Sequence, residues 1–227
     1  MNSSRIYMDS TIAQKRYEAQ ESTINELGDA LLDIVKSCGV VPEGNCFTEH
    51  CSFNKNELLR NKRINLLSLG TLLPPHARVM EIGMNAGHSL MLLLLGSDPT
   101  VTFDIYDICY HLYVKPCLDT LRNLFPSRNI TLIEGDSKET LLNILLHGNR
   151  EIYDCIHLDG GHTMDCVTND IVASMLLLKK GGYLLLDDVD NTFIGGYGMS
   201  LVHQGKLRLV EGQETTLMYP HLLFQKL

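Results

Sequence analysis

Residues 79–89, VMEIGMNAGHS, change from an apolar run to an acid, two glycines and a serine. This pattern predicts a strand, a nucleotide-binding turn and the start of a helix. Gly83 permits a sharp turn, and Gly87 lets the helix pack close to the strand. Ser89 falls where free N–H groups and the helix dipole favour a carboxylate, and Glu81 suits a cationic group. The turn therefore fits a ligand that carries both a carboxylate and an ammonium better than it fits a pyrophosphate.

Two other phosphate-binding motifs do not match this turn. A dinucleotide-binding G-x-G-x-x-G that begins at Gly83 would need glycines where the chain has Asn85 and His88. A P-loop would need a lysine after its last glycine, and none follows Gly87. A dinucleotide oxidoreductase is therefore the weakest of the alternatives.

Acidic residues also follow the next two predicted strands. Asp104 lies 21 residues after Gly83, where an acid can hydrogen-bond both hydroxyls of a ribose. The third strand is followed by EGDS at 134–137, in which Asp136 and Ser137 suit the edge of an adenine. Because ligands of open α/β sheets bind beyond the carboxyl ends of the strands, these residues are expected at one site.

The elements that would position these residues alternate between strand and helix after the Pro74-Pro75 pair. Predicted strands fall at 78–82, 100–105, 130–134, 153–158 and 183–186, and predicted helices at 89–95, 114–124, 138–146 and 164–180. Two further strands, at 207–210 and 221–227, have only a turn-rich link between them and predict an antiparallel pair. Nearly all-apolar strands favour an α/β fold with a parallel sheet covered on both faces.

The chain ahead of this region has a different character. Helical spacing of apolar residues extends from Thr11 to about Ser37, and a second helix is predicted from Lys55 to about Leu69. We expect residues 1–58 to form a helical extension, either a lid or a dimer surface, and residues 59–227 to form the ligand-binding domain.

Composition excludes some classes of function. The formal net charge is −8 and no Lys/Arg cluster forms a basic face, so no general nucleic-acid binding is expected. The longest apolar run, Leu90–Leu95, is too short to span a bilayer. Seven cysteines without a CxxC pair indicate reduced thiols, and the first ten residues lack the apolar core of a signal peptide. These features predict a cytoplasmic protein without a membrane partner.

The motifs EIGMNAGHS, FDI, EGDS, HLDGGH and LLLDDVDN together resemble the motif series of class I S-adenosylmethionine-dependent methyltransferases. Within that class the chain is most similar to the family-24 type and its metal-dependent relatives, the catechol and macrocin O-methyltransferases. The resemblance covers roughly residues 60–227. It implies a Rossmann-like, seven-stranded, mostly parallel sheet with an antiparallel C-terminal strand, and S-adenosylmethionine across the C-terminal edge.

The resemblance also implies which residues hold the methyl donor. Glu81, Gly83, Asn85, Gly87 and Ser89 would hold its methionine part. Asp104, with Ile105 beside it in the FDI motif, would take the ribose, and Asp136 with Ser137 the adenine side. Asp159 is counted with these donor-binding residues.

Acids at the ends of two further strands supply candidates for the chemistry. HLDGGH ends the fourth strand with Asp159, and LLLDDVDN ends the fifth with Asp187 and Asp188. If these strands are neighbours, three carboxylates converge, and hard oxygen ligands suit Mg²⁺. The metal-dependent relatives carry their metal ligands at these three positions, and their general base near His162. Asp159 and His162 are thus the predicted catalytic residues, because a divalent cation lowers the pKa of a hydroxyl and a base takes its proton.

The departures from the pattern concern the acceptor. Catechol-type enzymes have a lysine at the position of the base, where this chain has a histidine, and the chain contains no tryptophan. Both features disfavour a catechol-like acceptor. The glycine-rich segment 191–204 follows the predicted metal ligands and is expected to shape the acceptor site.

These residues predict an S-adenosylmethionine-dependent O-methyltransferase that acts on a small hydroxylated acceptor with Mg²⁺, with a homodimer through the N-terminal helices as one arrangement. Two alternatives stay open. One is a metal-independent methyltransferase that acts on a protein or nucleic acid. The other is a non-catalytic subunit that only binds the donor.

Overall fold

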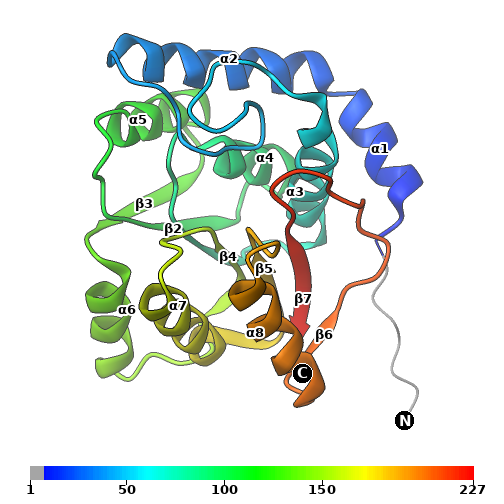
Figure 1. The fold of residues 1–227 in the computed structure, drawn as a ribbon, viewed down its shortest axis with the longest axis vertical. Coiled ribbons are helices and arrows are strands. Elements are labelled where there is room, and N and C mark those ends of the chain that lie inside the picture. The colour runs from blue at the N-terminus through cyan, green and yellow to red at the C-terminus, as the bar shows by residue number, and fades with distance from the viewer. Residues whose placement is uncertain (1–7) are drawn as a thin grey trace.

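Seven strands form one sheet in the order β3-β2-β1-β4-β5-β7-β6. The computed structural model describes residues 8–227 (Figure 1). The strands are β1 (Arg78–Ile82), β2 (Thr102–Asp107), β3 (Asn129–Glu134), β4 (Tyr153–Leu158), β5 (Leu178–Leu186), β6 (Leu207–Leu209) and β7 (Leu222–Lys226). Strands β1 to β5 pair in parallel, and β7 is antiparallel to both of its neighbours. The predicted sheet, mostly parallel with an antiparallel C-terminal strand, is confirmed.

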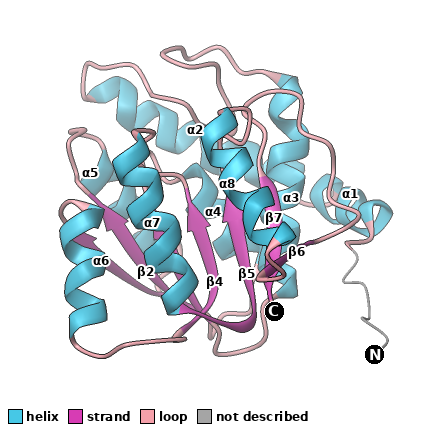
Figure 2. Ribbon diagram, turned by 60° about the horizontal axis from the view of Figure 1, so that its bottom comes forward, coloured by secondary structure: helices cyan, strands magenta, loops and turns pink. Residues whose placement is uncertain are grey.

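Helices cover both faces of the sheet (Figures 1 and 2). One face carries α2 (Glu21–Ser37), α3 (Arg60–Leu72), α4 (His88–Gly96) and α5 (Val114–Leu124), with α1 (Ser10–Glu18) beside α3. The other face carries α6 (Ser137–Leu146), α7 (Met164–Leu177) and α8 (Thr192–His203). Alternate residues of each strand enter the two apolar cores, as Val79 and Met80 do on β1. Within residues 8–227, no helix is long and apolar enough to cross a membrane.

One predicted element in the second half of the domain differs from the structure. The predicted helix 164–180 ends at Leu177, and β5 begins at the next residue, so Gly181 and Gly182 belong to the strand and do not end the helix. The segment 191–204 is mostly the helix α8, and its role at the acceptor site stays a prediction. Gly198 of this helix serves packing, because a Cβ there would lie 2.9 Å from Leu186 Cδ1 and 3.1 Å from Phe224 Cζ.

The N-terminal helices pack directly on the sheet domain. The predicted helix from Thr11 to Ser37 is two helices, α1 and α2, separated at residues 19–20. Apolar side chains of both share one core with β1 and α4, among them Tyr17, Leu31 and Val35. Residues 1–7 of the predicted extension lie outside the described residues, and the domain boundary after residue 58 stays a prediction.

Candidate active site

A cavity of about 810 Å³ opens at the carboxyl ends of the parallel strands. This volume lies within the roughly 300–1,000 Å³ of small-molecule sites. Strand ends β1 to β5 and the loops after them contribute most of its wall, including Gly83, Asn85, Asp107, Ile108, Gly135, Asp136, Ser137, Asp159, His162, Asp188 and Asn191. The segment ahead of α3, α3 itself and the chain before β7 contribute Glu43, Gly44, Asn45, His50, Lys62 and Tyr219.

The turn between β1 and α4 has a backbone that requires glycine. Gly83 has φ +84°, and a Cβ there would lie 2.0 Å from the carbonyl oxygen of Asp159. Gly87 has φ +80° and is the N-cap of α4, with the Leu121 side chain 2.8 Å from the position of a Cβ. Asn85 Nδ2 donates to the carbonyl oxygen of Gly44 at 3.0 Å, so the turn is tied to the N-terminal segment. The predicted turn therefore lies at the cavity, although Gly87 itself is not among the residues that line it.

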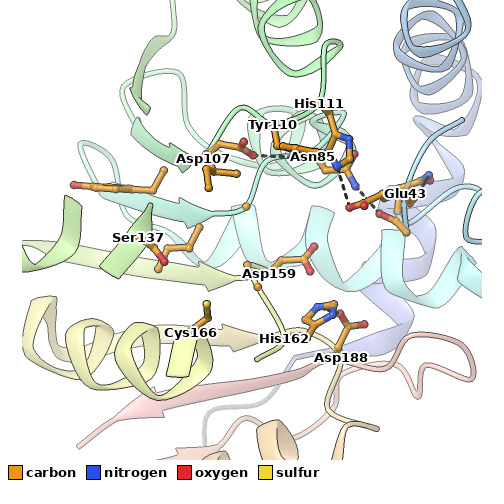
Figure 3. Close-up of a pocket in the computed structure, with 18 of the residues that line it drawn as sticks. Glu43, Asn85, Asp107, Tyr110, His111, Ser137, Asp159, His162, Cys166 and Asp188 are labelled. Atoms are coloured by element: carbon orange, nitrogen blue, oxygen red, sulfur yellow. Dashed lines mark hydrogen bonds and ion pairs between the residues drawn. The ribbon is translucent and has the colours of Figure 1, made fainter. Parts of the chain in front are cut away.

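Asp107, at the end of β2, holds this turn in place. Its Oδ2 accepts hydrogen bonds from the backbone N–H groups of Met84 at 2.8 Å and Asn85 at 3.2 Å. Its Oδ1 accepts one from Cys109 N–H at 2.6 Å. Asp107 also lines the cavity, so its carboxylate lies at the strand end where an acid for a ribose is predicted (Figure 3).

Asp104 and Ile105, predicted to contact the donor ribose, do not line the cavity. The Asp104 carboxylate is buried, pairs with Arg78 Nη2 at 2.6 Å and accepts a hydrogen bond from Tyr153 Oη at 2.9 Å. Ile105 is fully buried in the core on the other face of the sheet. The reason is the length of β2, which continues two residues past its predicted end and so brings Asp107 to the sheet edge.

Glu81 lies beneath the cavity in a buried row of polar side chains. It has no exposed surface and does not line the cavity, so the predicted direct contact with a donor ammonium is not found. Glu81 Oε1 accepts from Ser89 Oγ at 2.5 Å and lies 2.9 Å from His157 Nδ1. Burial alone would lower the pKa of His157, but the Asp187 and Glu81 carboxylates raise it to about 10. The cation that Glu81 faces is therefore His157.

Asp187 lies next to His157 in this buried row of polar side chains, on the side of α3. Its Oδ1 accepts a hydrogen bond from Lys62 Nζ at 2.6 Å, and its Oδ2 lies 3.6 Å from His157 Nε2. Burial would raise the pKa of Asp187, but the Lys62 ammonium outweighs it and holds this pKa well below its usual value. Asp187 is thus a buried carboxylate between two cations.

Asp159, Asp188 and His162 face the cavity from the ends of β4 and β5 (Figure 3). His162 Nε2 lies 2.7 Å from Asp188 Oδ2, and this hydrogen bond raises the pKa of His162 above its usual value. Burial, together with the Asp187 carboxylate, raises the pKa of Asp159 well above its usual range. The cluster therefore combines the His162 imidazole, whose pKa is raised, with the Asp159 carboxyl group, which is protonated more easily than usual.

The predicted metal ligands are not brought together as one set. Among the described residues, two groups of side chains have ligand atoms within 4.8 Å of one another: His157 with Asp159 and Asp187, and His162 with Asp159 and Asp188. Asp159 belongs to both groups, whereas Asp187 and Asp188 fall in different ones. The group that faces the cavity is Asp159, His162 and Asp188.

The adenine side of the predicted site lies in the same cavity. Asp136 is the N-cap of α6 and accepts from Lys138 N–H at 2.9 Å. Asp136 and Ser137 line the cavity, and Ser137 lies on the same side of it as Cys166 of α7 (Figure 3). Their contact with an adenine stays a prediction.

Several residues at the cavity were not predicted as site residues. Glu43 Oε2 pairs with His111 Nε2 at 3.1 Å, and the His111 ring stacks on Tyr113 with 5.0 Å between centroids. On the N-terminal segment, His50 N–H donates to Tyr219 Oη at 3.2 Å. These residues come from segments far apart in the chain and carry no local motif, so only the tertiary structure identifies them.

Comparisons with known proteins agree with this architecture. Residues 80–189 match the family model described as a methyltransferase domain. No curated protein matches the sequence. A protein from Klebsiella pneumoniae, provisionally assigned as an O-methyltransferase, has a TM-score of 0.63 at 13% identity, covering 95% of this chain and 99% of that one. An O-methyltransferase from Bacillus cereus in complex with SAH has a TM-score of 0.61 at 12% identity, covering 96% and 97%. A precorrin-6y C5,15-methyltransferase from Geobacter metallireducens has a TM-score of 0.55 at 17% identity, covering 80% and 93%.

Proposed function

We propose that this chain, which carries a class I S-adenosylmethionine-dependent methyltransferase domain, transfers the donor methyl to a hydroxyl oxygen of a small acceptor. One observation supports this most. The turn between β1 and α4, which we call the donor turn, opens into the cavity together with Asp107 at the end of β2. The His162–Asp188 pair opens into the same cavity from the ends of β4 and β5. A donor bound along the turn would bring its methyl toward the side of the cavity where a proton acceptor stands.

The reaction is an in-line displacement at carbon. The acceptor oxygen attacks the methyl carbon, the C–O bond forms as the C–S bond breaks, and the sulfur keeps the electron pair as a neutral thioether. The protein contributes mainly by aligning the two reactants. The hydroxyl proton also has to leave, since an alcohol is a weak nucleophile.

We assign His162 as the general base that accepts this proton. Its Nε2 lies 2.7 Å from Asp188 Oδ2, and this contact fixes the orientation of the ring. With Nε2 carrying the hydrogen toward Asp188, Nδ1 is the free nitrogen that accepts the proton. Asp188 then stabilises the imidazolium that results.

Asp159 and Asp188 are the residues we assign to a divalent cation. Mg²⁺ is commonly held by one or two carboxylates together with waters and substrate oxygens, and two carboxylates facing a cavity fit that requirement. Asp187 is left out of the set because Lys62 Nζ already occupies its Oδ1. When bound, the cation would lower the pKa of a coordinated hydroxyl.

A hydroxylated acceptor suits the polar groups around the cluster. Asp190 and Asn191 line the cavity directly after Asp188, and Tyr219 and His50 line it as well. These side chains offer hydrogen-bond donors and acceptors at the side where the acceptor would lie. The net charge of −8 disfavours a nucleic acid as acceptor.

The test is methyl transfer from donor labelled in its methyl group. The acceptors are a panel of saccharides, hydroxylated natural products and phenols, together with protein and RNA, each with Mg²⁺ and with EDTA. We expect the label in an alkali-stable ether of a small hydroxylated compound, with turnover reduced by EDTA. Label found only in protein or RNA would contradict the assignment, and full turnover in EDTA would remove the cation from it.

A further inference from the structure

Lys62 places an ammonium among the acids at the cavity floor. Its side chain is 7% exposed and Nζ donates to Asp187 Oδ1 at 2.6 Å. Burial would lower the pKa of this ammonium, but the carboxylates of Asp187, Asp159 and Asp188 raise it above its usual value. Lys62 also lines the cavity. The acid cluster therefore contains a positive charge that belongs to the protein itself.

The helix that carries Lys62 holds it firmly. Residues 62–70 of α3 are all buried, and α3 packs against α4. The next residue, Arg63, donates from Nε to Tyr17 Oη at 2.7 Å. Asn65, one turn along the helix, lies 2.9 Å from His221 Nε2. These contacts hold the backbone of α3 in place, and with it the stem of the Lys62 side chain.

Asp187 has little capacity left for another cation. Besides Lys62, its Oδ1 accepts the backbone N–H of Asp188 at 2.9 Å, and its Oδ2 lies 3.6 Å from His157 Nε2. His157 is in turn held at 2.9 Å by Glu81. A divalent ion on Asp187 would stand beside the Lys62 ammonium, and that repulsion is strong at a buried site.

We infer that Lys62 prevents Asp187 from acting as a ligand of the cation site and thereby keeps the affinity of that site for Mg²⁺ low. The inference rests on the cation site proposed above at Asp159 and Asp188. With Lys62 present, those two carboxylates are the accessible oxygen ligands. Without its charge, Asp187 becomes available as a further ligand beside Asp159, with which it shares one of the two groups of potential ligands.

The test is calorimetric titration of MgCl₂ into the protein saturated with S-adenosylhomocysteine, without an acceptor. Lys62→Met removes the charge, and we expect it to bind Mg²⁺ at least tenfold more tightly than the wild type. Lys62→Met combined with Asp187→Asn removes the third ligand again, and we expect it to lose this gain. Lys179→Met is the matched control, because Lys179 also pairs with an aspartate, Asp154 at 2.8 Å, at the opposite end of β5. It should leave the affinity within twofold of the wild type.

Circular dichroism establishes that each variant is folded. If Lys62→Met does not fold, Lys62→Leu replaces it, because leucine removes both the charge and the donor to Asp187. A folded, charge-free variant with unchanged or weaker Mg²⁺ binding would overturn the inference. Because the titration needs no turnover, the inference fails separately from the proposed function: a tenfold gain without methyl transfer to any acceptor would contradict only the latter.

Discussion

Gly83 lies where the first strand turns toward the cavity, and its backbone angle and surroundings both require glycine. In Gly83→Ala, a side chain at positive φ would also meet the carbonyl oxygen of Asp159. We expect a loss of about 1–3 kcal/mol in the free energy of unfolding, and a loss of S-adenosylhomocysteine binding because the turn must shift. Urea denaturation and calorimetry measure the two effects.

Gly196 is the matched control for this substitution. It lies in α8, where a Cβ would meet nothing within 4 Å. Gly196→Ala should be neutral or raise the free energy of unfolding by up to about 1 kcal/mol, since alanine favours a helix. Equal effects of the two substitutions would remove the special role of Gly83.

Substitutions of Asp107 and Asp104 distinguish an effect on donor binding from an effect on stability. Asp107→Asn weakens three backbone hydrogen bonds that hold the donor turn, and removes the carboxylate facing the cavity. We expect it to weaken S-adenosylhomocysteine binding by roughly tenfold to a hundredfold, or about 1.4–3 kcal/mol. Asp104→Asn should leave this affinity within about threefold and lower the melting temperature, because it breaks the Arg78 pair. The reverse pattern in calorimetry would restore the original prediction for Asp104.

The pH dependence of turnover reports on His162. Asp188 raises the pKa of His162 above 6.5, so the imidazole stays protonated, and unable to act as a base, below that raised value. Turnover should therefore rise with pH through a midpoint above 6.5. His162→Gln should abolish this rise and cut turnover by roughly 10² or more, whereas the exposed His147→Gln should change neither. A pH profile that is the same in wild type and His162→Gln would take the base role away from His162.

At the scale of elements, the N-terminal helix α2 is part of the domain core. Leu31 has no exposed surface and packs in the core shared with α4. Leu31→Ala should lower the free energy of unfolding by about 2–5 kcal/mol. Ile12→Ala on α1, where the side chain is 54% exposed, should change it by less than about 0.5 kcal/mol. Urea denaturation in which Leu31→Ala costs no more than Ile12→Ala would contradict this packing.

Most elements could be predicted because their periodicity is local. Strands β1 and β4 and helix α5 have the predicted bounds, since apolar runs and amphipathic spacing mark them directly. The predictions failed where one pattern runs into the next. Leu178 continues the helical spacing of α7, yet it starts β5, where it pairs with Tyr153.

At the scale of the whole molecule, the site combines what sequence motifs reveal with what only folding brings together. The turn at Gly83 and Asn85 could be located because it follows a strand directly. The choice of Asp107 over Asp104 depends on where β2 ends, which the residues TFDIYD do not determine. Lys62 could not be predicted at all, because it reaches Asp187 from a helix 125 positions away in the chain.

The central claim is that the donor lies in this cavity with its sulfur toward Asp159 and His162. A crystal structure of the protein with S-adenosylhomocysteine tests it most directly. We predict the amino-acid part along the turn at Gly83, the ribose hydroxyls at Asp107, and the sulfur on the side of His162. S-adenosylhomocysteine bound outside the cavity, or bound with its sulfur turned away from Asp159 and His162, would contradict the account.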